Sequence, residues 1–390
     1  MRPSLARLPE ETRQRQSRLV AAALRAAYAW SERAGHPEAM KEISRMTGVV
    51  MEALGPGTGP AAPMQLVGFL RRPLGELLCL TEPGGDPDGA ADDAISEAVL
   101  LSPDGLLADA AYDLACEYAR QLAEAFETAE WLPPWTRMRA EQIENQVFAA
   151  LVESGDQDSY TRARRFLVDY PASDRPELSA RLAATGTRCA ARYSALPPEQ
   201  RYPGPDGQWW WPCPACRWPM TVTGDQVRCR YRLHQAFYQA VPGRAAMSPP
   251  QLLRTGDRGT RAVPRARPTR DAVCVDPGVW RYIVVPGASE IRIAAALEKA
   301  GAEVRLWPGM DAYDLHVRAG TLERRLDVKE YRSARRLIED LRDSPPRADV
   351  LLPATHEHQT DLITAAIPSL PVVTETALRR QVRQAARRNP

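Results

Sequence analysis

Lysine is nearly absent from this chain: of its 51 basic residues, 48 are arginines and only three are lysines. Positive charge is therefore supplied almost everywhere by the planar guanidinium group, which differs from an ammonium group in shape, hydration and hydrogen bonding. One of the three lysines, Lys329, lies in a short strand-like run, where a compact charge suits a specialised site. We therefore take Lys329 as the first candidate for a functional residue.

Long apolar runs are also lacking. No stretch approaches the roughly 18 uninterrupted apolar residues that a membrane span needs. The first twelve residues carry prolines and acids where a signal peptide would have an apolar region. The seven cysteines are an odd number, which favours free thiols or metal ligands over a disulfide framework. We expect a cytoplasmic protein with no membrane segment.

Acidic residues are scarce in two segments, although the net charge of the whole chain is only +2. Residues 228–270 contain ten arginines and one acid, and the chain after Glu375 contains five arginines and no acid. Such segments can contact nucleic-acid phosphates, although a solvated linker and an ordinary basic terminus would have the same composition. We expect DNA as a partner, with Arg230 and Arg232 among the contacts.

Four segments of different character divide the 390 residues. Residues 1–195 show helical spacing of apolar side chains and no cluster of chemically active groups, which predicts an all-helical scaffold or docking domain. A small zinc-binding module is expected at 205–240 and a basic linker at 241–270. Residues 271–390 alternate short β-type runs with helices, which predicts a C-terminal α/β domain.

The middle module contains a pattern of metal ligands. Cys213 and Cys216 form a CxxC pair, and Cys229 with His234 forms a second pair after a turn. Four such ligands at this spacing suit tetrahedral zinc, and the tryptophans around them would shield the metal. We predict a structural zinc ion, with Cys189 as an alternative fourth ligand in place of His234.

The C-terminal segment predicts a strand over 280–285, a helix over 289–300, and three strands over 302–306, 313–318 and 325–329. Glu290 falls on the inward, apolar face of the predicted helix. A carboxylate there could be an accessory metal ligand or an orienting group. A glutamate in the first helical turn is equally favoured by the helix dipole alone.

Two carboxylates and the lysine fall on the last two of these strands. If the strands pair as a hairpin, Asp314 stands beside Asp327, and Lys329 shares the face of Asp327. The two carboxylates and the backbone carbonyl of Val328 would form a partial oxygen shell for Mg²⁺ or Mn²⁺. Lys329 would orient the attacking water or steady the developing negative charge. A charged hairpin that matches this short pattern by chance is the structural alternative.

Residues 279–352 resemble the restriction-endonuclease-like domain associated with prokaryotic PIWI-RE three-gene islands, a branch of the PD-(D/E)xK superfamily. The resemblance lies in the runs Val-Trp-Arg-Tyr, Pro-Gly-Ala-Ser-Glu, Trp-Pro-Gly-Met-Asp-Ala-Tyr-Asp-Leu and Leu-Asp-Val-Lys-Glu. It implies an αβββαβ core, metal ligands at Asp314 and Asp327, a catalytic lysine at Lys329 and the helix glutamate at Glu290. Asp311 is an alternative to Asp314 as the first ligand.

The same resemblance implies partnership with a PIWI-like protein and a helicase in defence against invading DNA. A helix over 333–342 would bring Arg335 and Arg336 toward the DNA backbone. We therefore expect a magnesium-dependent DNA endonuclease subunit. The alternatives are a catalytically inactive DNA-binding or scaffold subunit of the same assembly, and a zinc-ribbon DNA-binding regulator.

Overall fold

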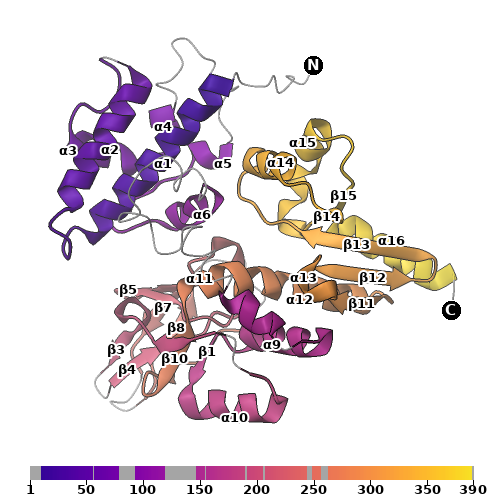
Figure 1. Ribbon diagram of the computed structural model, residues 1–390. Helices are drawn as coiled ribbons and strands as arrows, with labels where there is room; N and C mark the ends of the chain where they lie inside the picture. The colour runs from indigo at the N-terminus through magenta and orange to yellow at the C-terminus, as the bar shows by residue number, and fades with distance from the viewer. Residues whose placement is uncertain are drawn as a thin grey trace. The chain divides into compact units, whose positions relative to one another are not determined.

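The computed structural model describes residues 10–388, apart from 56, 79–92, 119–145, 154, 189–190, 205–206, 244–247 and 256–261. It forms two compact units, shown as a ribbon in Figure 1. The first unit comprises Met1–Glu141 and the short segment Tyr331–Arg336, and the second comprises Gln142–Glu330 and Leu337–Pro390. None of the described helices is both long and apolar enough to cross a membrane.

The first unit is helical where it is described. Its helices are α1 (Glu10–Glu32), α2 (Ala39–Leu54), α3 (Pro63–Leu70), α4 (Gly75–Leu78), α5 (Asp93–Ser96) and α6 (Asp109–Glu117). Helix α1 is rich in alanine, which favours helix and lets neighbouring helices pack closely, and most of its residues from 19 to 30 are buried. Arg25 and Glu42 form a buried ion pair between α1 and α2.

The second unit contains a five-stranded mixed sheet with the order β11-β12-β13-β14-β15. The strands are β11 (Glu303–Leu306), β12 (Leu315–Ala319), β13 (Leu322–Val328), β14 (Asp349–Leu352) and β15 (Val372–Thr374). The first three are antiparallel, whereas β13, β14 and β15 run parallel. With α12 (Val285–Glu298) before β11 and α14 (Ala334–Asp343) between β13 and β14, the elements follow the predicted order αβββαβ.

The core of this sheet is formed with two helices. Ile293 and Leu297 of α12 and Leu378 and Val382 of α16 (Glu375–Arg388) belong to one buried apolar cluster with Leu315, Val317 and Leu326 of the strands. Alternate residues of β12 are buried, as the period of two predicts. A 3₁₀ turn (Ala354–Gln359) and α15 (Thr360–Ala366) connect β14 to β15.

The strand predicted over 280–285 is wrong, because these residues are helical. Asp276 caps α11 (Pro277–Val279) by accepting a hydrogen bond from the Gly278 N–H at 2.8 Å. The chain continues as a π-helix (Trp280–Val284) directly into α12. The wider π turn immediately precedes Pro286, which has no N–H to donate. Burial of these bulky side chains against neighbouring elements outweighs their preference for strands.

The rest of the second unit includes two longer helices and three small sheets. Helices α9 (Gln157–Asp169) and α10 (Arg175–Thr185) are accompanied by β1 (Ala172–Asp174), β2 (Tyr193–Ala195) and β10 (Ala272–Val275), which form one sheet. Strands β3 (Tyr202–Gly204), β4 (Gly207–Trp210) and β9 (Arg267–Pro268) form a second. The third is β5 (Thr221–Thr223), β6 (Gln226–Arg228), β7 (Phe237–Val241) and β8 (Gln251–Arg254).

Two of the segments expected from the sequence can be compared with these elements. Residues 1–195 include β1 and β2 besides helices, and α9 and α10 belong to the second unit. Residues 241–270, expected to be a linker, contain β8 and β9, each paired with a strand of a small sheet.

Candidate functional site

Asp314 and Asp327 lie on neighbouring strands of the five-stranded sheet. Leu315 pairs with Leu326 in the antiparallel ladder, and the Asp314 N–H donates to the Leu326 carbonyl at 3.1 Å, which continues the pairing beyond β12. The Asp314 carboxylate accepts a hydrogen bond from the Val328 N–H at 2.7 Å. Asp314 therefore reaches the backbone between Asp327 and Lys329.

Burial and neighbouring charges shift the pKa values of both carboxyl groups. Burial raises the pKa of Asp314 well above its ordinary value, the charge of Glu290 raises it further, and the charge of Lys329 lowers it. Burial also raises the pKa of Asp327, again opposed by Lys329. The Lys329 N–H donates to the Leu351 carbonyl at 3.0 Å, which fixes the lysine backbone to β14.

Glu290 is held by two partners in the interior. Its side chain accepts hydrogen bonds from the Trp307 indole and from Arg164, whose Nη2 lies 3.3 Å from Glu290 Oε2. Glu290 is 2% exposed, and burial raises its pKa although Arg164 and Trp307 oppose that shift. The carboxylate is thus held in place by protein groups.

Arg164 of α9 is a central member of this site that the sequence analysis missed. Its guanidinium pairs with both Glu290 and Asp311 and lies 4.7 Å from the centroid of the Trp307 ring. Tyr160 accepts a further hydrogen bond from it at 3.2 Å. The positive charge of Arg164 therefore balances two carboxylates that would otherwise repel each other.

The loop that carries Asp311 has an unusual backbone. Trp307, Met310 and Asp311 all have positive φ values, of 51°, 53° and 77°, in the region that side-chain-bearing residues rarely adopt. Gln157 of α9 holds this loop by donating to the Trp307 carbonyl at 2.9 Å and accepting from the Met310 N–H at 3.0 Å. Strained residues of this kind persist only where their surroundings hold them, often at functional sites.

Several charged groups act on one another at this site. The charge of Asp311 acts on the carboxylates of Glu290, Asp314 and Asp327. Arg164 pairs with Asp311 and Glu290, and the charge of Lys329 acts on Asp314 and Asp327. One carboxylate oxygen, Asp311 Oδ1, is buried without a hydrogen-bond partner. Burial is the first cause of the raised carboxyl pKa values, so these carboxyls bind protons more readily than ordinary ones. Carboxylate oxygens are the ligands that hard divalent cations prefer, and Asp311 Oδ1 is an unused acceptor.

Three cysteines and one histidine form a much more compact cluster elsewhere in the second unit. The ligand atoms of Cys213, Cys216, Cys229 and His234 all lie within 4.8 Å of one another, the only such group among the described residues. Cys216 Sγ is 4.0 Å from Cys229 Sγ, and His234 Nδ1 is 3.3 Å from Cys229 Sγ and 3.6 Å from Cys213 Sγ. Tetrahedral zinc requires about 3.8 Å between sulfurs and about 3.6 Å between sulfur and nitrogen.

The cluster therefore has a geometry compatible with zinc, with His234 in the fourth position. The alternative ligand, Cys189, lies outside the described residues. The Trp280 indole donates to Cys216 Sγ at 3.3 Å and stacks on Trp218 with a centroid distance of 4.5 Å. Because Trp280 leads directly into α12, these contacts connect the cluster to the helix that carries Glu290.

A second connection reaches the residue next to Lys329. Tyr231, beside the cluster, donates to Glu330 Oε2 at 2.9 Å, and Ser289 of α12 also donates to Glu330. A cleft of about 800 Å³ lies here, and its lining includes Tyr231, His234, Ser289 and Glu330. His234 of the cluster and Glu330, the neighbour of Lys329, thus line the same cleft.

Four arginines were predicted to contact DNA. Arg336 is 4% exposed and donates to the Glu117 carbonyl at 2.7 Å, so its side chain is buried and hydrogen-bonded within the helical unit. Arg230 bonds Thr221 and Glu199, each at 3.2 Å. Arg335 is partly exposed, and the side chain of Arg232 lies outside the described residues. Arg230 and Arg335 are thus both partly exposed, whereas Arg336 is buried.

Two family models match this chain. Residues 15–174 match "pPIWI_RE three-gene island domain Y", and residues 287–390 match "REase associating with pPIWI_RE". No curated protein and no solved structure matches it. The matches confirm the resemblance to the REase associated with pPIWI_RE islands. Helix α9 and Arg164 fall within the first match, although they belong to the same structural unit as the second.

Proposed function

We propose that this chain is the metal-dependent DNA endonuclease subunit of a pPIWI_RE-type defence system. The family match over residues 287–390 supports a nuclease-like role in such an island. The observation that carries the catalytic proposal is the hydrogen bond from the Val328 N–H to the Asp314 carboxylate. This hydrogen bond connects Asp314 to the backbone of the residue that lies between Asp327 and Lys329.

Asp314, Asp327 and the Val328 carbonyl would hold Mg²⁺ or Mn²⁺, because these ions prefer oxygen ligands and keep positions open for water and phosphate. The bound ion would supply Lewis acidity at the scissile phosphate. Lys329 would orient the attacking water and stabilise the negative charge that develops on the phosphate oxygens. Asp311, with its unsatisfied oxygen, is a further candidate ligand or water-binding group.

Glu290 and Arg164 would act as positioning residues. Glu290 lies within the electrostatic reach of Asp314, while Arg164 fixes both Glu290 and the Asp311 loop. This arrangement keeps the carboxylates gathered when no cation is bound. It is consistent with Glu290 acting as an orienting group.

The Cys3His cluster would bind a structural zinc ion. Three buried thiols and an imidazole leave no open coordination position of the kind that catalytic zinc sites have. The hydrogen bonds of Trp280 and Tyr231 would help to hold α12 and Glu330 in place next to the zinc cluster. The zinc would therefore support the nuclease site without taking part in the reaction.

The remaining features of the proposal concern the assembly. Both family descriptions name the pPIWI_RE island, which implies a PIWI partner. DNA as substrate, a helicase as second partner and a cytoplasmic location complete the proposal. A subunit that binds DNA without cutting it is the main rival, because Arg164 already neutralises two of the four carboxylates. A zinc-ribbon regulator would instead prefer one duplex sequence.

Cleavage of plasmid and single-stranded DNA with Mg²⁺ or Mn²⁺ tests the proposal. Asp327→Asn should abolish cleavage, since it removes a ligand charge with little change of shape. Glu323→Gln is the matched control, because Glu323 lies on the same strand with an exposed side chain. Equal cleavage by both variants would reject the site. If the chain needs its PIWI partner to cut, the same pair is compared in the reconstituted complex.

A further inference from the structure

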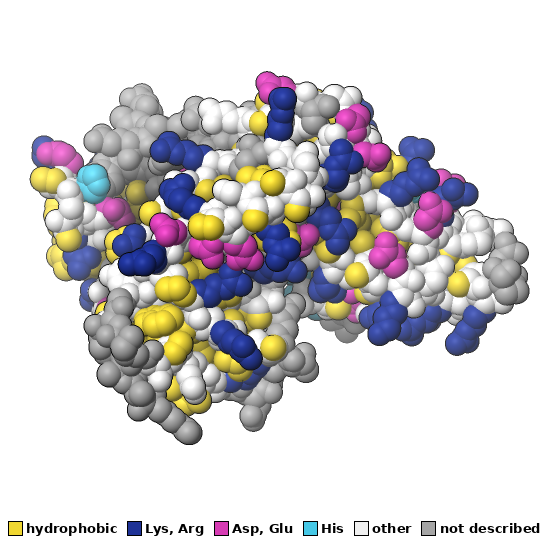
Figure 2. Space-filling model, turned by 90° about the horizontal axis from the view of Figure 1, so that it is seen from below, with side chains coloured by type: hydrophobic (Ala, Val, Ile, Leu, Met, Phe, Trp, Pro, Cys, Tyr) yellow, Lys and Arg dark blue, Asp and Glu magenta, His cyan; other side chains and the backbone are white. Residues whose placement is uncertain are grey.

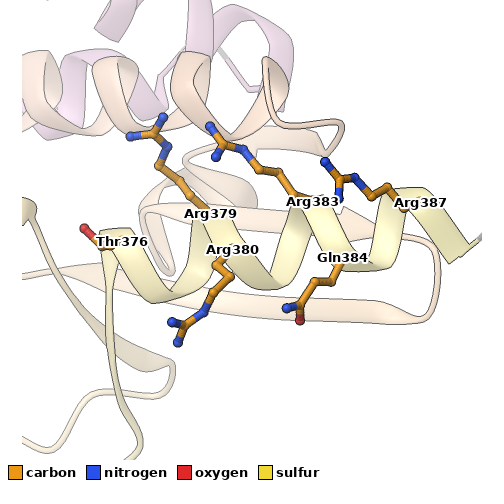
Figure 3. A pocket seen from close by; sticks show the side chains of 6 residues that line it. All are labelled: Thr376, Arg379, Arg380, Arg383, Gln384 and Arg387. Carbon is orange, nitrogen blue, oxygen red and sulfur yellow. The ribbon is translucent and has the colours of Figure 1, made fainter.

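The C-terminal helix α16 presents a row of arginines. Arg379, Arg383 and Arg387 recur every fourth residue, so successive side chains emerge from one side about 6 Å apart along the helix. Figure 3 shows these three pointing to the same side, with Arg380 on the opposite side. Together with Thr376 and Gln384 they line a hollow of about 430 Å³.

Three of these arginines lack acidic partners. Within the part of the chain that the structure describes, Arg380, Arg383 and Arg387 are exposed and form no ion pair. Arg379 Nε is buried without a hydrogen-bond partner. By contrast, Arg292 and Arg324 of the same unit each pair with a carboxylate. The charge on α16 is therefore available to a ligand from outside the chain.

The helix is held firmly by its other face. Leu378 and Val382 are fully buried in the core of the five-stranded sheet. Glu375, the one acid of the helix, is occupied by Arg292 at 2.7 and 2.9 Å. At the right of Figure 2, where Figure 1 shows α16, β12 and β13, many Lys and Arg side chains lie at the surface with several Asp and Glu side chains among them. The arginines therefore project from a helix whose opposite face is packed against the sheet.

We infer that α16 binds the phosphodiester backbone of DNA. Arginine matches phosphate geometry through paired N–H donors, and a row of them at regular spacing follows a charged strand. The described face offers no carboxylate to contact cytosine and no aromatic ring to stack on a base, so it would bind without preference for sequence. The choice of DNA rests on the proposed function, whereas the phosphate chemistry rests on the helix alone.

The experiment measures binding separately from cleavage. Fluorescence anisotropy of a labelled mixed-sequence duplex is followed with the full chain carrying Asp327→Asn, without added divalent metal, over a series of salt concentrations. The test variant adds Arg380→Gln, Arg383→Gln and Arg387→Gln. The control adds Arg15→Gln, Arg71→Gln and Arg188→Gln instead, which remove the same charge from three exposed positions elsewhere. Thermal melting and zinc content check that both variants are folded.

The test variant should bind about tenfold or more weakly, and its logarithmic salt dependence should fall by about three, which is close to one for each lost phosphate contact. The control variant should lose much less affinity, and its salt dependence should fall much less. Affinity and salt dependence equal to those of the control would overturn the inference. Unchanged DNA binding with lost binding of polyglutamate would also overturn it, because α16 would then serve an acidic protein partner.

Discussion

Replacing Arg164 with methionine should strongly destabilise the second unit. The arginine and Glu290 are 6% and 2% exposed, so the substitution leaves a buried carboxylate without its cation. Removing one partner of such a pair costs about 3–5 kcal/mol of unfolding free energy. A unit of this size loses about 2–4 °C in Tm per kcal/mol, so the melting temperature should fall by roughly 6–20 °C.

Arg165→Met is the matched control on the same helix. Arg165 is 53% exposed and lies 3.4 Å from Asp169, so its loss should change the unfolding free energy by about 0.5 kcal/mol or less. Differential scanning calorimetry compares the two variants with the parent chain. Equal melting temperatures for both variants would refute the argument that Arg164 supports a buried cluster of charge.

Two further measurements sharpen this test. Burial already raises the pKa of Glu290, and loss of Arg164 raises it further, so Glu290 protonates more readily in the variant. The stability deficit of Arg164→Met should therefore shrink as the pH falls and grow as the pH rises. Adding Glu290→Gln should recover part of the stability, because the buried charge is then removed together with its partner.

The remaining predictions concern the two metals. Purified protein should contain about one zinc per chain by elemental analysis, and Cys213→Ser should reduce the zinc content and the melting temperature together; a fully folded, zinc-free preparation would contradict this. Because the pKa of Asp314 is raised in the metal-free protein and a ligand must be ionised, protons compete with the metal. The Mg²⁺ concentration needed for half-maximal cleavage should therefore rise as the pH is lowered. In Asp314→Asn, where this carboxyl is absent, the pH dependence of the residual metal requirement should be weaker; an unchanged pH dependence in that variant would contradict a role for Asp314 as a ligand.

The features set by short sequence spacing were predictable. The ligand cluster follows from a CxxC pair and a second pair thirteen and eighteen residues after Cys216, and the structure brings all four side chains together. The three strands from 303 to 328 follow from alternation and from turns at Gly301 and Gly320, both of which have positive φ. Local patterns of this kind are decided by a few neighbouring residues.

The features that the sequence did not predict correctly depend on contacts between distant segments. Arg164 lies 126 residues from Glu290 and 147 from Asp311, so no local pattern connects them. Arg336 was expected to approach the DNA backbone from its helix, but it donates to a carbonyl 219 residues away. The run from Trp280 to Val284 has strand propensity, yet a capped helix start and burial make it helical. In each case tertiary packing outweighed the local preference.

Binding of Mn²⁺ tests the central claim most directly, because it does not depend on a partner or on the right DNA substrate. Electron paramagnetic resonance of free Mn²⁺ during a titration should show one tight site in the parent chain. That site should be lost or greatly weakened in Asp314→Asn and in Asp327→Asn, but not in Glu323→Gln. Equal Mn²⁺ binding by all four proteins would contradict the claim that Asp314 and Asp327 jointly hold a divalent ion.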